Sequence, residues 1–116
     1  MRFLPLILLP FLATPAFAAR VGPGTQVEAV RMNTTSARIL VRNPGGMRGN
    51  FTVGAYDVTT GEEVPTVVSP RSFALAPRRS RKVRFSQLPN QDLLLCATVE
   101  VSPALDLRSC VFSEQR

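Results

Sequence analysis

The sequence predicts an all-β protein built as an antiparallel sandwich, and three observations support this prediction. Short runs alternate apolar and polar residues, which is the pattern of strands with one buried face. Turn residues, mainly Pro and Gly, separate these runs. Nothing after residue 18 shows the 3.6-residue period of an amphipathic helix. Seven such runs are typical of an immunoglobulin-like sandwich of seven strands.

We expect the seven strands at residues 27–32, 37–42, 51–56, 65–75, 80–85, 93–101 and 106–112. The alternation is clearest where Arg84 separates Val83 from Phe85, and again along 93–101. The strand over 65–75 is expected to be irregular, because Pro70 interrupts it and proline cannot donate a backbone hydrogen bond. A turn is predicted at 43–46, where an Asn-Pro-Gly-Gly sequence follows the second strand.

The N-terminus has the features of a secretory signal peptide. Arg2 precedes an apolar run over residues 3–12, and Ala16-Phe17-Ala18 provides a cleavage site of small residues. The run is shorter than the ~20 apolar residues that span a bilayer. We therefore expect a signal peptide at 1–18, a single immunoglobulin-like domain at 19–116, a periplasmic or secreted location, and no transmembrane segment after cleavage.

The chain has two cysteines, Cys96 and Cys110, and export would place them in an oxidising compartment. Pro103 lies midway between them, so a hairpin with its tip there would bring them opposite each other on adjacent strands. Closing a loop of about 15 residues stabilises a fold by roughly 3 kcal/mol in the chain-entropy model. Because no Cys-x-x-Cys spacing is present, we expect a structural disulfide and not a redox site.

The chain after residue 18 is basic. It has 13 Lys and Arg residues (the 14 of the whole chain less Arg2) against 8 Asp and Glu, which gives a net charge of +5. In an immunoglobulin-like sandwich the second and fifth expected strands are neighbours in one sheet. Their outward residues would then form one basic stripe: Arg38, Arg42, Lys82 and Arg84.

Two interpretations of the basic stripe stay open. It can be a solvated sheet face that also opposes edge-to-edge aggregation. It can also attract an anionic envelope surface or an acidic partner. A nucleic acid is not expected as a partner, because the chain has one Tyr and no Trp on which bases could stack.

The residues do not predict a catalytic or cofactor site. The chain has no His, which is the commonest general base and metal ligand. Two disulfide-bonded cysteines leave no set of zinc ligands. Glu62 and Glu63 are adjacent, so in a strand their carboxylates would point to opposite faces. Asp57 is expected to cap a turn after the third strand. We therefore expect a binding or structural protein, not an enzyme, with no metal and no cofactor.

Several short motifs follow one another from Ser69 to Pro103. In order, they are Ser69-Pro70, Leu75-Ala76-Pro77, Val83-Arg84-Phe85, Leu88-Pro89 and Glu100-Val101-Ser102-Pro103. Their order and spacing resemble the N-terminal domain of periplasmic pilus-assembly chaperones, the PapD-like family. The resemblance extends over residues 25–112 once the flanking strands are included. Classical members have two such domains, whereas residues 19–116 have room for one. Some members join their last two strands by a disulfide.

The resemblance implies β-strand addition, in which an edge strand pairs with a protein partner such as a pilus subunit. Three apolar residues alternate along the expected last strand: Leu105, Leu107 and Val111. Ser109 interrupts this row, and the alternative is that the three residues complete the core. The resemblance also implies that Arg31, on the first strand, and Arg108, on the last, grip the C-terminal carboxylate of the partner.

The sequence thus predicts a pilus-chaperone-like binding protein of envelope or fimbrial assembly. The alternative is a small secreted structural or adhesion module without chaperone activity. The two differ in one observable feature. A chaperone needs an exposed apolar edge strand, whereas a structural module has its edges protected by charge.

Overall fold

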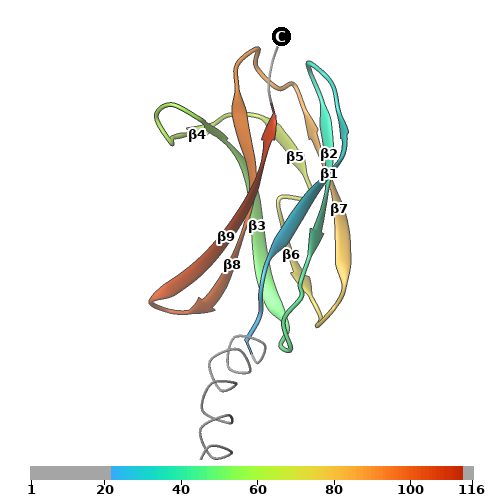
Figure 1. The fold of residues 1–116 in the computed structure, drawn as a ribbon, viewed down its shortest axis with the longest axis vertical. Helices are drawn as coiled ribbons and strands as arrows, with labels where there is room; N and C mark the ends of the chain where they lie inside the picture. Colours follow the sequence, from blue (N-terminus) through green and yellow to red (C-terminus); the bar gives the residue numbers. More distant parts are fainter. Residues whose placement is uncertain (1–21, 114–116) are drawn as a thin grey trace, which may run out of the picture.

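A computed structural model describes residues 22–113, which form two antiparallel sheets packed face to face (Figure 1). Sheet A has the order β1 (Gln26–Met32), β2 (Ala37–Arg42), β7 (Ser80–Ser86) and β5 (Val67–Ser69). Sheet B has the order β4 (Glu63–Val64), β3 (Gly49–Asp57), β8 (Leu93–Ser102) and β9 (Leu105–Ser113). A further strand, β6 (Ser72–Leu75), also pairs with β3. The predicted all-β immunoglobulin-like sandwich is confirmed.

The predicted signal peptide at 1–18 lies outside the described residues. Within residues 22–113 no helix has the length and apolar character needed to cross a membrane.

The core lies between the sheets and consists of alternate residues of the central strands. Its largest fully buried apolar side chains are Ile39, Val41, Phe51, Val53, Val83, Phe85, Leu93, Leu95 and Val99. The residues between them face outward, as Arg84 does between Val83 and Phe85. Burying one large apolar side chain contributes about 1.5–3 kcal/mol. The period-two pattern of the sequence therefore supplies both the sheets and the contact that holds them together.

The main difference from the expected strands is in residues 63–75. The sequence predicted one irregular strand over 65–75, but the structure has β5 in sheet A and β6 in sheet B. The chain changes sheet around Pro70, whose missing N–H prevents a continuous ladder. Phe73 of β6 stacks on Phe51 of β3 with ring centroids 5.8 Å apart. The two-residue strand β4, which pairs with the end of β3, was not predicted.

Asn43 is a fully buried polar residue directly after β2. Its Oδ1 accepts hydrogen bonds from the backbone N–H groups of Gly24 and Gly45, both at 3.0 Å. Its Nδ2 donates to the carbonyl oxygens of Met47 at 2.8 Å and Leu75 at 3.1 Å. One side chain therefore connects the segment before β1, the turn after β2 and the end of β6. The sequence predicted a turn here but no role for this amide.

Asp57 ends β3 and caps the turn that follows, as expected. Its Oδ1 accepts hydrogen bonds from the backbone N–H groups of Thr59 at 2.7 Å and Thr60 at 2.9 Å. The Nε2 of Gln91 donates to its Oδ2 at 2.7 Å. The hydrogen bonds from the Thr60 and Thr59 backbone lower the pKa of Asp57 from its ordinary value of 3.8.

Candidate functional site

β9 is an outer strand of sheet B and pairs with β8 along one side. Its first four residues, 105–108, are exposed, whereas residues 109–111 are partly buried. Figure 1 shows the tip of the β8–β9 hairpin leaning away from sheet A. An edge strand presents unpaired backbone N–H and C=O groups to a partner. Within residues 22–113, the first half of β9 therefore has an open edge that sheet A does not cover.

Leu105, Leu107 and Val111 lie on the face of β9 that turns toward the core. Leu107 is opposite Val99 and Val111 is opposite Leu95, and both of these partners are buried. Val111 packs against the core, but the exposed fractions of Leu105 and Leu107 are 52% and 39%. Only Val111 therefore fits the alternative in which these residues complete the core. The two leucines form a short exposed apolar row beside the open backbone edge.

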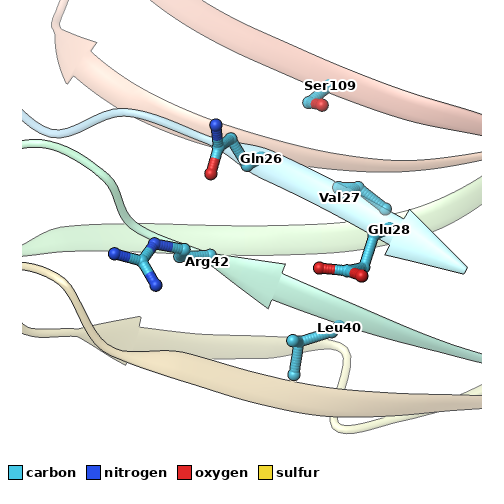
Figure 2. A pocket seen from close by; sticks show the side chains of 6 residues that line it. All are labelled: Gln26, Val27, Glu28, Leu40, Arg42 and Ser109. Atoms are coloured by element: carbon cyan, nitrogen blue, oxygen red, sulfur yellow. The ribbon is translucent and has the colours of Figure 1, made fainter. Parts of the chain in front are cut away.

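Ser109, which interrupts this row, lies where β1 approaches β9. It lines a shallow hollow together with residues of β1 and β2 (Figure 2): Gln26, Val27, Glu28, Leu40 and Arg42. The neighbouring β1 accounts for the partial burial of the second half of β9. The first half extends past β1 and stays open.

The predicted disulfide between Cys96 and Cys110 is present. The two residues are directly opposite in the β8–β9 ladder, and the hairpin turns at Pro103-Ala104. The bond lies on the outer face of sheet B, because its neighbours Leu95 and Ala97 face the core. It fixes the register of β9 against β8 close to the exposed leucines.

The structure does not bring Arg31 and Arg108 together. Arg108 points out of sheet B, where its guanidinium lies 4.4 Å from the centroid of the Tyr56 ring and its Nε donates to Thr98 Oγ1 at 3.3 Å. Arg31 points out of sheet A, directly opposite Arg38 of β2. The two side chains therefore leave opposite faces of the sandwich, because each is one position away from a core-facing residue. In this structure the two side chains therefore do not converge on one point.

The four residues of the expected basic stripe lie on the outer face of sheet A. The register of β2 against β7 places Arg38 opposite Arg84 and Leu40 opposite Lys82. Arg31 of β1 extends the row beyond Arg38. We call these five residues the basic face: Arg31, Arg38, Arg42, Lys82 and Arg84. The sequence did not predict Arg31 as a member, because a β-bulge between Ala29 and Arg31 shifts the register of β1.

No family model matches the chain, and no curated protein matches it. Solved structures match it in fold. The E. coli chaperone DraB superposes with a TM-score of 0.61 at 16% identity, over 83% of this chain and 56% of the DraB chain. The structure of the Salmonella enterica SafA pilin in complex with the SafB chaperone gives 0.60 at 17% identity, over 79% and 54%.

The chain has the fold of about half of a pilus chaperone. A third match is the CsuC–CsuE complex of chaperone and tip subunit from Csu pili of Acinetobacter baumannii, with a TM-score of 0.54 at 12% identity. It covers 79% of this chain and 52% of the other. At these identities the likeness concerns the fold alone. The chain spans about half the length of the chaperone structures that it matches.

Proposed function

We propose that this chain is a pilus-chaperone-like binding protein of envelope or fimbrial assembly, and that it holds its partner by β-strand addition along β9. The observation that carries the proposal is the pair of exposed leucines, Leu105 and Leu107, on an open edge strand. Asp106 and Arg108 place charge on the other face of the same segment, but the face that the two leucines share has none, whereas a purely structural module would have it covered or charged. The pilus-chaperone fold supports the same function.

The geometry of β9 suits strand addition. A partner segment would pair with the free backbone of residues 105–108, and alternate side chains would enter an apolar groove in the partner. Leu105 and Leu107 are two residues apart on one face, as this arrangement requires. Burying the exposed part of each leucine would contribute about 1 kcal/mol, a fraction of the 1.5–3 kcal/mol for a fully buried side chain. The Cys96–Cys110 disulfide would keep the strand extended and in register before binding.

A pilus subunit is the proposed class of partner. Two of the matching structures are complexes of a chaperone with a pilin and with a tip subunit. A periplasmic location is part of the proposal, and two features support it. The disulfide needs a compartment that does not reduce it, and residues 1–18 have the pattern of a signal peptide.

The test is co-expression of the full chain with a panel of pilus subunits in the bacterial periplasm, followed by isolation through a tag on the chain. We expect a subunit to be recovered with the wild type and lost with Leu107→Asp, because strand addition would bury an unpaired carboxylate. Asp106→Ser is the matched control, since Asp106 is exposed on the opposite face of the same strand. Thermal unfolding should show both variants folded, because neither residue is buried.

Equal recovery of the subunit by the wild type and Leu107→Asp would refute strand addition through β9. If no subunit binds the wild type, the structural-module alternative is favoured.

Arg31→Ala and Arg108→Ala belong in the same series. Since these two side chains leave opposite faces, we expect at most one of the two substitutions to reduce recovery of the subunit.

A further inference from the structure

The outer face of sheet A concentrates positive charge that strand addition along β9 does not use. We propose that the basic face docks the protein onto an anionic phospholipid bilayer. The proposal is independent of the partner that β9 binds.

The register places three arginines in a row across three adjacent strands. Arg31 of β1 is opposite Arg38 of β2, which is opposite Arg84 of β7. Directly opposite side chains have Cβ atoms about 4.5–5.5 Å apart, and like charges at that distance destabilise a sheet. Lys82 and Arg42 extend the charge along β7 and β2. Glu28 is the only acidic residue in the four strands of sheet A.

The charges of the basic face are not used inside the described part of the chain. Within residues 22–113 the five side chains form no ion pair, and the one ion pair found there joins Arg71 to Glu63. Protection of a sheet edge does not account for them either. Four of the five lie on β2 and β7, which are inner strands paired on both sides. Their N–H donors are therefore available to an external ligand.

The chemistry of the face favours phosphate groups. Arginine donates paired, charge-assisted hydrogen bonds to phosphate oxygens. Open hollows flank the arginine row on both sides. One is lined by Arg38, Ser69, Lys82, Val83 and Arg84, and the other by Arg31, Asn33, Ser36, Ala37, Arg38 and Arg84. Each hollow combines guanidinium and hydroxyl groups, which suits a lipid headgroup.

The residue composition of the basic face favours a membrane over an acidic protein as its partner. A protein interface usually has a desolvated centre rich in aromatic side chains. In the four strands of sheet A the one aromatic residue, Phe85, is buried in the core. Leu40 and the exposed Val67 are scattered apolar side chains on the outer face, which therefore offers charge spread over three strands without an aromatic centre. A fluid bilayer surface with many mobile phosphates can match such a distribution, and clusters of four to eight basic residues are typical of binding to anionic lipid.

The test is sedimentation of the full chain with lipid vesicles. One set contains phosphatidylcholine alone, and the other also contains phosphatidylglycerol. We expect binding to the anionic vesicles that weakens as salt is raised. Arg38→Gln with Arg84→Gln should reduce this binding roughly 30-fold, since each basic residue near an anionic surface contributes about 1 kcal/mol. Arg48→Gln with Arg78→Gln removes the same charge from exposed loop positions outside the basic face and should bind as the wild type does.

Several outcomes would overturn the proposal. Equal losses in the two double variants would mean that net charge alone governs binding. If the protein bound neutral vesicles as strongly as anionic ones, the binding would be assigned to the apolar residues 3–12, which are the same in all variants. Binding to immobilised polyglutamate or to inorganic phosphate, without binding to anionic vesicles, would assign the face to an acidic protein or a free anion. Thermal unfolding of each variant checks that it is folded.

Discussion

Replacing Asn43 with alanine should be among the most damaging single changes outside the apolar core. The substitution removes two acceptor contacts, to the N–H groups of Gly24 and Gly45, and two donor contacts, to the carbonyls of Met47 and Leu75. The bonds to Gly45 and Leu75 are buried, so water cannot readily replace them. An unpaired buried polar group costs about 1–3 kcal/mol. The two buried partners, with a smaller cost for the other two, give an expected loss of about 3–5 kcal/mol.

The assay is urea unfolding followed by circular dichroism at neutral pH. With a slope of about 1 kcal/mol per molar urea for a small domain, the midpoint should fall by roughly 3–5 M, or the variant should be unfolded without urea. Asn33→Ala is the matched control, because the Asn33 Oδ1 also accepts hydrogen bonds from Thr35 N and Ser36 N, but on the surface. We expect the control to cost less than about 1 kcal/mol. Equal losses for Asn43→Ala and Asn33→Ala would refute the argument from burial.

Two further predictions concern stability. Cys110→Ser should lower the free energy of unfolding by about 2–5 kcal/mol. In the same urea titration, the reduced wild type should be as stable as the variant. A variant as stable as the oxidised wild type would show that the disulfide does not stabilise the fold. Asp57→Asn should lower the melting temperature at neutral pH, because backbone hydrogen bonds from Thr60 and Thr59 hold the pKa of the carboxyl low in the folded state. This stabilisation is present above the pKa of Asp57 in the unfolded chain and is lost as the pH falls through the lower pKa of the folded state. The melting temperatures of variant and wild type should therefore converge as the pH falls below about 4. A difference in melting temperature that stays constant with pH would contradict the prediction.

Much of the fold could be predicted from the sequence, because its strands are half buried and carry a clear period-two pattern. Val83 and Phe85 of β7 are an example, since both are fully buried whereas Lys82 and Arg84 are exposed. The same reasoning failed at 65–75, where pattern alone does not indicate which sheet each half joins. The crossing at Pro70 depends on pairing with β7 on one side and β3 on the other. Asn43 was missed for a similar reason, since two of its four partners, Gly24 and Leu75, are distant in the sequence.

The candidate site was predictable to the extent that it depends on one strand. The alternation of Leu105, Leu107 and Val111 gives their common face, and the spacing of the cysteines gives the β8–β9 pairing. Whether a leucine on that face is covered depends on how far sheet A extends over it. The local sequence pattern does not give this information. The separation of Arg31 from Arg108 likewise depends on which sheet each strand joins. A bulge in β1 then decides the register of Arg31.

The two proposed surfaces belong to different sheets, so each can bind its partner without blocking the other. The basic face points outward from sheet A, whereas β9 lies at the edge of sheet B and its hairpin tip leans away from sheet A (Figure 1). A bilayer lying against the basic face would therefore leave the exposed leucines of β9 free, and a partner strand on β9 would leave the arginine row uncovered. Because no residue of the arginine row lies on β9, Leu107→Asp and the pair Arg38→Gln with Arg84→Gln each change one surface. The loss of one activity with retention of the other is the pattern that this geometry requires.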